Sequence, residues 1–111
     1  RARRRPMMTD STPVVLTLVM PIEVADPLIE TLLEHPELAP GFTSHPVEGQ
    51  GQRVTFVGTA EHVRGRAAYA RVQLAVGRSE ADSLLAILRE RFATDRVFFW
   101  MVPAIASGRL A

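Results

Sequence analysis

The chain has 111 residues, of which 13 are basic and 12 acidic, and it contains no cysteine. That length suits one domain with a hydrophobic core and is too short for two domains of ordinary size. The absence of cysteine excludes disulfides, zinc-cysteine clusters and thiol nucleophiles. Every basic residue is an arginine, so a Schiff-base lysine and a phosphate-loop lysine are excluded as well.

Residues 1–12 are expected to form a disordered extension ahead of a domain that spans 13–111. The segment RARRRP precedes Met7 and Met8, so the native start is expected at one of these methionines. Without the four arginines of that segment the chain has nine basic residues against 12 acidic ones. No clustered basic face follows, so nucleic acid is not expected as a partner. No signal peptide or membrane-spanning run is visible, which predicts a cytoplasmic protein that does not insert into a membrane.

The first two predicted elements are a strand and a helix. Residues 14–20, VVLTLVM, form a β-branched and apolar run between two prolines, which is typical of a buried strand. A helix follows, with Pro27 expected in its first turn and Pro36 ending it. Its apolar positions repeat at helical spacing: Leu28, Ile29, Leu32 and Leu33.

A second strand is predicted over 41–49, GFTSHPVEG, where Pro46 favours an edge or bulge position. The glycine-punctuated stretch 49–65 lacks a sustained period and predicts a long loop, with a short strand weighed for RVTFV. Loops of that length inside a compact domain are commonly functional. A third strand is predicted over 67–76, because apolar and polar residues alternate there.

The second half of the domain ends with a helix and a strand. The spacing of Ser79 and Asp82 predicts a capping box that opens the helix. The apolar stripe of this helix consists of Leu84, Leu85, Leu88 and Phe92. The run VFFWMV, residues 97–102, predicts the last strand.

This order of elements, β-α-β-β-α-β, predicts a ferredoxin-like α+β fold in which two helices cover one face of a four-stranded antiparallel sheet. The first and last strands are apolar at nearly every position, so both of their faces should be buried. Two helices cover only one face of the sheet. We therefore expect the other face to meet another subunit in a homo-oligomer.

Catalytic arrangements are weakly supported by the sequence. Ser44 and His45 are adjacent in a strand, so their side chains point to opposite faces and cannot act as nucleophile and base. Trp100 lies in an apolar strand and is expected to pack in the core or at a subunit interface. The enzymatic alternative is a small-molecule monooxygenase that would use Trp100 and a histidine in a pocket between the helices and the sheet.

The three histidines, His35, His45 and His62, show no close pair that would present two metal ligands from one element. His35 suits a helix end, where it meets the last carbonyls. A divalent-metal site remains open in two forms, with His62 beside Glu61 or with His45 beside Glu48 across a subunit boundary.

The glycines that enter the long loop, Gly49 and Gly51, fit a turn as readily as a phosphate cradle, because neither nucleotide-binding glycine motif is present. The backbone freedom of glycine is the reason expected for both. Three arginines of the loop could contact an anion or a partner: Arg53, Arg64 and Arg66.

From Val14 to Leu110 the chain resembles the PII-like signalling proteins. GFTSHPVEGQGQ is similar to the family's second strand and to the Gly-x-Gly entry of its long loop. ARVQLAVGRSEADSLLAIL is similar to the third strand and second helix, and DRVFFWMVP to the last strand. More narrowly, LLEHPELAPGFTS, EHVRGR and VPAIASGRL resemble an uncharacterised family of short PII-like proteins often associated with heavy-metal efflux systems.

The resemblance implies a trimer whose sheets face its centre and whose loops are available to a partner. Classical PII proteins hold adenine nucleotides between subunits, partly through a Gly-Asp-Gly-Lys segment and arginines near the C-terminus. This chain has ATDR instead, with Arg96 at the lysine's place, and Arg109 alone remains in the tail. Gln52 and Arg53 stand where an arginine and a ligand-contacting glutamine would be, in changed order. An adenine nucleotide is therefore a doubtful ligand.

These observations favour a non-enzymatic, trimeric PII-like regulator whose loop at 49–65 docks on a partner, such as a transport or efflux component, in response to a small ligand. If the ligand is a divalent metal, His62 and His45 are expected to bind it. If it is an anion, the expected ligand-binding residues are Gly49, Gly51, Gln52, Arg53, Arg96 and Arg109.

Overall fold

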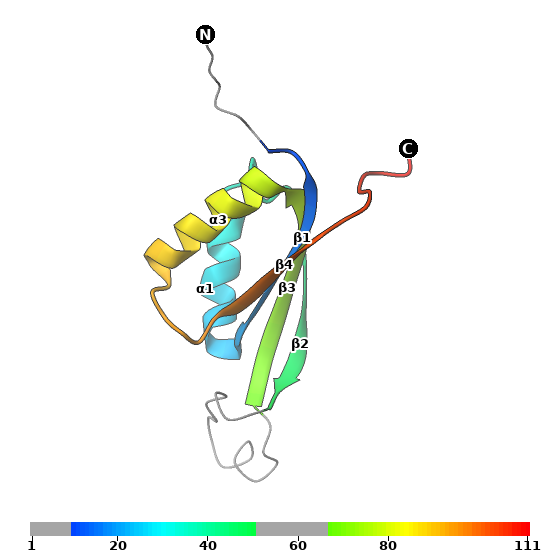
Figure 1. The fold of residues 1–111 in the computed structure, drawn as a ribbon. Coiled ribbons are helices and arrows are strands. Elements are labelled where there is room, and N and C mark those ends of the chain that lie inside the picture. The colour runs from blue at the N-terminus through cyan, green and yellow to red at the C-terminus, as the bar shows by residue number, and fades with distance from the viewer. Residues whose placement is uncertain (1–9, 51–66) are drawn as a thin grey trace.

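The computed structural model describes residues 10–50 and 67–111, which form a four-stranded antiparallel sheet with two helices on one of its faces (Figure 1). The elements follow one another as β1 (Pro13–Pro21), α1 (Ile22–Leu33), β2 (Thr43–Gly49), β3 (Ala67–Gly77), α3 (Arg78–Arg91) and β4 (Phe98–Pro103). The predicted ferredoxin-like β-α-β-β-α-β fold is confirmed.

The sheet has the strand order β2-β3-β1-β4, so β2 and β4 are its edges. Leu16 of β1 stands opposite Leu74 of β3 and Met101 of β4. Directly opposed residues point to the same face of a sheet, so these three side chains lie on the face that the helices cover. We call this the inner face, and the uncovered one the open face.

The core lies between the inner face and the two helices. Leu16, Leu18 and Val72 are at most 1% exposed, because the helices seal the centre of the sheet. The helices contribute apolar stripes with the expected 3.6-residue period, except that Leu33, predicted in the stripe of α1, is 64% exposed. Their buried leucines are Leu28, Leu32, Leu84, Leu85 and Leu88.

The first helix begins earlier than the sequence suggested. Because α1 starts at Ile22, Pro27 lies inside the helix and not in its first turn, so that expectation was wrong. Proline has no N–H, which leaves the carbonyl four residues earlier without its helical donor. The Pro27 carbonyl accepts a side-chain hydrogen bond from the buried Thr31 hydroxyl at 3.0 Å.

The start of α3 also differs from the prediction, since no side chain caps it. The segment ahead of β1 supplies backbone acceptors instead: the Arg78 N–H donates to the Thr12 carbonyl at 2.8 Å, and the Ser79 N–H donates to the Asp10 carbonyl at 2.9 Å. The capping box expected at Ser79 and Asp82 was therefore wrong. Of the extension expected over 1–12, residues 10–12 are described, and they hold this helix end.

The open face carries the apolar surface that the strand composition predicted. Phe98 is 66% exposed, Trp100 40% and Val102 44%, and all three lie on β4. The predicted excess of uncovered apolar strand surface is therefore confirmed for the single chain. Within the described ranges, neither helix has the length and apolar character needed to span a bilayer.

Candidate functional site

The predicted ligand-binding residues divide into two groups. Gly51, Gln52, Arg53 and His62 lie outside the described residues, as does most of the predicted loop over 49–65. Gly49, His45, Arg96 and Arg109 are described, so the structure places them relative to the sheet. The site below is built from these residues and the side chains that they contact.

Gly49 and Arg96 lie at the same end of the sheet but toward opposite edges. Gly49 ends β2, which is one edge, and Arg96 stands two residues before β4, which is the other. Two strands separate these edges, so Gly49 is roughly 14 Å from the β4 side at a strand spacing of about 4.8 Å. One chain therefore does not bring the two residues together.

Arg96 is held by an acidic residue that the sequence did not single out. Its Nη2 donates to the Glu23 Oε2, which joins the connection between α3 and β4 to the first turn of α1. A hydrogen bond from the Glu23 backbone N–H, followed by the Arg96 guanidinium, holds the pKa of the Glu23 carboxyl below its ordinary value. The Arg96 Nε is buried and has no partner, so part of this guanidinium is unsatisfied.

Gly49 is required by a close contact. A Cβ placed on Gly49 would lie 2.8 Å from Cδ1 of Tyr69, whose ring is buried across the neighbouring strand. Its φ lies outside the left-handed region that favours glycine. Backbone freedom, the reason expected from the sequence, was therefore wrong for Gly49. The tight approach of Tyr69 fixes the end of β2, where the chain leaves toward residue 51.

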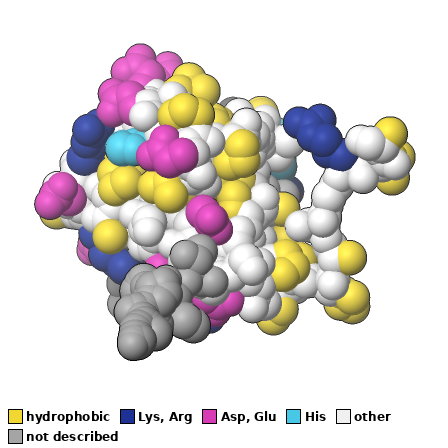
Figure 2. All heavy atoms as spheres, turned by 90° about the horizontal axis from the view of Figure 1, so that it is seen from above, with side chains coloured by type: hydrophobic (Ala, Val, Ile, Leu, Met, Phe, Trp, Pro, Cys, Tyr) yellow, Lys and Arg dark blue, Asp and Glu magenta, His cyan; other side chains and the backbone are white. Residues whose placement is uncertain are grey.

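Arg109 lies at the other end of the molecule. It belongs to the tail after β4, which leaves the sheet beside the start of β1, where Val14 opposes Pro103. The tail stands away from the body (Figures 1 and 2), and Figure 1 shows it on the side of the sheet opposite the helices. Ile105 and Leu110 are fully exposed, so this tail packs against nothing in its own chain at those positions. Arg96 and Arg109 are not brought together in one chain.

His45 contacts Arg71, an arginine that the sequence analysis passed over. Arg71 Nη2 lies 2.7 Å from His45 Nε2 on adjacent strands. A guanidinium has only donors, so the imidazole Nε2 is the acceptor and its lone pair is engaged. Among the described residues, no group of three metal-ligating side chains comes together. In this geometry His45 contacts an arginine and belongs to no metal-ligand cluster of described residues.

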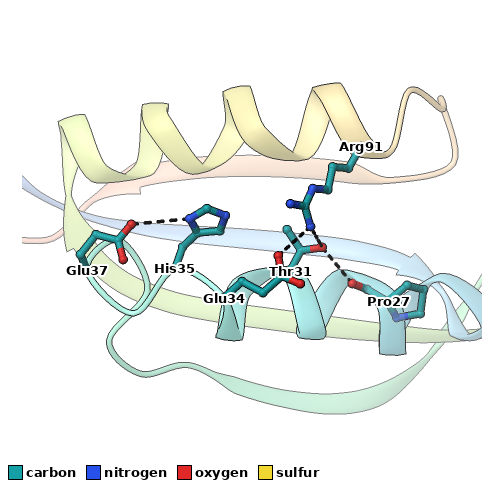
Figure 3. A network of polar contacts seen from close by, with 6 residues as sticks. All are labelled: Pro27, Thr31, Glu34, His35, Glu37 and Arg91. Atoms are coloured by element: carbon teal, nitrogen blue, oxygen red, sulfur yellow. Dashed lines mark hydrogen bonds and ion pairs between the residues drawn. The ribbon is translucent and has the colours of Figure 1, made fainter.

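The remaining histidine belongs to a network that ties the helical layer together (Figure 3). His35 Nδ1 lies 3.5 Å from Glu37 Oε2 just after α1. Arg91 of α3 reaches across to α1, where its Nη1 donates to Glu34 Oε1 at 2.8 Å and lies 3.5 Å from the Thr31 hydroxyl. The Arg91 contacts fasten the two helices to each other, and the His35–Glu37 contact lies within the connection after α1, so both have a structural role.

A cavity of about 200 Å³ lies between the helices and the sheet. The described residues that line it are mostly apolar and include no histidine: Leu18, Leu28, Leu85, Leu88, Arg89, Phe92, Thr94, Val97 and Phe99. Trp100 opposes Thr17 on the open face, away from this cavity. The structure therefore does not assemble the monooxygenase pocket that combined Trp100 with a histidine.

Two functional candidates were missed because their signals were weak. Glu23 is an acidic residue in a helix's first turn, where it suits the helix dipole without any partner. Arg71 alternates with buried Val72 and Ala70, so it looks like an ordinary outward strand residue. The alternation of the third strand puts Arg71 on its outward side, but the pairing register of β2 with β3 was needed to place His45 opposite it.

Comparison with protein families and solved structures gives a consistent result. The family model described as "Protein of unknown function (DUF3240)" matches residues 10–111. A DUF3240 family protein from Shewanella baltica is similar to this chain at 20% identity and a TM-score of 0.72, covering 91% of this chain and 99% of that one. No curated protein sequence matches this chain.

Two further solved structures share the fold at lower identity. CPII, a nitrogen regulatory PII-like protein from Thiomonas intermedia bound to ADP, AMP and bicarbonate, has 15% identity and a TM-score of 0.63, covering 88% of this chain and 97% of that one. The periplasmic divalent cation tolerance protein CutA from Archaeoglobus fulgidus has 11% identity and a TM-score of 0.64, covering 87% and 88%. The predicted PII-like fold is confirmed.

Proposed function

Since the chain belongs to the DUF3240 family and has a PII-like fold, we propose that it is a non-catalytic, trimeric regulator that binds a small anionic ligand between subunits. The ligand changes how the segment over 49–65 docks on a partner protein, for which a transport or efflux component is the leading candidate. Cytoplasmic location follows from this role and stays a prediction.

One observation carries the proposal: the candidate site is divided between two edges of the sheet. Gly49 ends the β2 edge, and Arg96 precedes the β4 edge at the same end. A second copy whose β4 edge approaches the β2 edge of the first would place Arg96 beside the entry to the 49–65 segment. The exposed Phe98, Trp100 and Val102 supply apolar surface for such a contact.

The choice of an anion over a metal rests on the arginines. Arg96 has an unsatisfied buried Nε, and Arg109 projects on an exposed tail that is free to reach another copy. Arginine binds carboxylate and phosphate oxygens through paired donors. The nucleotides and bicarbonate bound to CPII belong to that protein, and they define the ligand classes to be tried first here.

Thermal unfolding of the purified protein with ADP, AMP, bicarbonate, zinc or copper tests the proposal. A ligand at 100 times its dissociation constant stabilises by about 2.7 kcal/mol. We expect an anion to raise Tm in the wild type and in the control Arg78→Gln, whose arginine pairs with Asp82 on the outside of α3. We expect no such rise in Arg96→Gln, measured from that variant's own ligand-free Tm.

An anion-induced rise that is unchanged in Arg96→Gln would contradict the assignment of Arg96. A rise caused only by zinc or copper and lost in His62→Ala would contradict the anionic ligand and favour the metal alternative. Absence of a rise with every compound would contradict a ligand-binding regulator and favour a scaffold.

A further inference from the structure

In two neighbouring rows of the open face, the side chains on β2 and β3 are polar, and we call these four residues, Thr43, His45, Arg71 and Gln73, the polar half. Strand pairing places His45, Arg71, Val19 and Phe98 in one row across the four strands. The next row contains Thr43, Gln73, Thr17 and Trp100. The β2 and β3 members of both rows are polar, and the β4 members are aromatic. A ligand that contacts both strands of the polar half therefore meets hydrogen-bonding side chains.

Arg71 is incompletely satisfied at the centre of that polar half. Its Nη2 contacts His45 Nε2 at 2.7 Å, while its Nε is buried without a partner. Nε and Nη2 form the edge of a guanidinium that binds an oxyanion through two parallel hydrogen bonds. One donor of this edge is thus used by a neutral imidazole, and the other is unused.

The charge of Arg71 is not balanced on its own face. Along the described strands, the open face contains no aspartate or glutamate. The members are Pro13, Val15, Thr17, Val19, Pro21, Thr43, His45, Val47, Gly49, Ala67, Tyr69, Arg71, Gln73, Ala75, Gly77, Phe98, Trp100 and Val102. By contrast, Arg78, Arg91 and Arg96 each contact a carboxylate. A cation in a half-buried site with no acidic neighbour favours binding of an anion.

We propose that the open face binds a tetrahedral inorganic oxyanion, of the phosphate or sulfate class, between Arg71 and His45. The oxyanion accepts bonds from Nε and Nη2 of Arg71. The exposed His45 ring turns aside, and its Nε2 is released from Arg71. A neutral imidazole can carry its proton on either nitrogen, so His45 then donates to the same oxyanion.

This site is separate from the one at Gly49 and Arg96, because His45 lies four residues before Gly49 on β2 and Arg71 lies beside it on β3. The effect of the bound oxyanion on subunit association, in contrast, rests on the proposed trimer. If the open faces turn toward a common centre, several Arg71 side chains approach one another there. Like charges at close range oppose association, and a bound oxyanion would offset that repulsion.

Isothermal titration of inorganic phosphate at constant ionic strength and a single pH tests the inference. We expect saturable binding to the wild type and to Arg78→Gln, and at least a tenfold weaker dissociation constant for Arg71→Gln. Arg71→Lys keeps the charge but loses the two-donor edge, so it should bind with intermediate affinity. Circular dichroism confirms that each variant is folded, and Arg71→Lys serves if Arg71→Gln is not.

Wild-type protein that shows no phosphate binding, or Arg71 variants that bind as tightly as the wild type, would overturn the inference. Sedimentation in phosphate and in chloride separates it from the proposed function. A monomer in both buffers with phosphate binding intact contradicts the trimer alone. A stable trimer whose Arg71 variants bind phosphate normally contradicts the oxyanion site alone.

Discussion

The two faces of the sheet differ in how completely their side chains are satisfied. On the inner face Leu16, Leu18 and Val72 are sealed beneath two helices, and Arg91 of α3 pairs with the Glu34 carboxylate. On the open face the β4 side chains are exposed and Arg71 meets an imidazole and no carboxylate. The difference indicates that the inner face holds the fold together and that the open face is built to meet something else.

The largest expected effect comes from truncating the inner face. Leu16 is 0% exposed at the centre of β1, so Leu16→Ala removes buried methyl groups and leaves a cavity. We expect a loss of about 2–5 kcal/mol in the free energy of unfolding, measured by urea denaturation. The same change at Leu33, which is 64% exposed on α1, is the matched control and should cost less than about 1 kcal/mol. Equal losses at the two positions would remove the distinction between sealed and exposed surface.

A change on the open face should separate assembly from folding. Trp100 is 40% exposed on β4 and contacts Phe98, with ring centroids 5.9 Å apart. In Trp100→Asp a carboxylate would stand in the proposed subunit contact, where its desolvation is costly. We expect sedimentation to show monomers in place of trimers, with the far-UV circular dichroism of the wild type. If Trp100→Asp sediments as the wild type does, the open face is not the subunit contact.

The smallest expected effect is at the ion pair of Glu23 and Arg96. Because the folded pKa of Glu23 is lowered, the stability it contributes is present above its ordinary value of 4.5 and is lost as pH falls below it. Both side chains are more than a third exposed, so the pair is worth at most about 1 kcal/mol. Glu23→Gln should lower stability slightly at neutral pH and should match the wild type in strong acid. A difference that persists unchanged in acid would contradict a contribution from the ionised pair.

The sequence predicted the fold well because hydrophobic periodicity is a local signal. The alternation in β3 and the leucine spacing of α3 identified both elements, and their order left few possible topologies. Boundaries were less well predicted where the determinants are remote or lie in the backbone. Carbonyl groups of Asp10 and Thr12 cap α3, and no pattern of side-chain types reports such a cap.

The candidate site was predictable only in part for the same reason. Arg96 was identified by its position before the last strand, whereas its partner Glu23 is 73 residues away in the chain. The contact of Arg71 with His45 depends on the register of β2 with β3, which the intervening segment does not encode in a readable motif. Gly49 was identified, but the Tyr69 ring, which leaves no room for a side chain at that position, lies on another strand.

The pairing of Val14 with Pro103 has a practical consequence. Residues 10–12 and the tail after β4 both lie at the end of the strands opposite the one where Gly49 pairs with Ala67 (Figure 1). The two ends of the strands therefore differ, and a tether attached to the tail after β4 would leave the opposite ends of the strands facing the solution. A bead or sensor surface that carries the protein by its C-terminus would leave the paired ends of β2 and β3, at Gly49 and Ala67, facing any partner in solution.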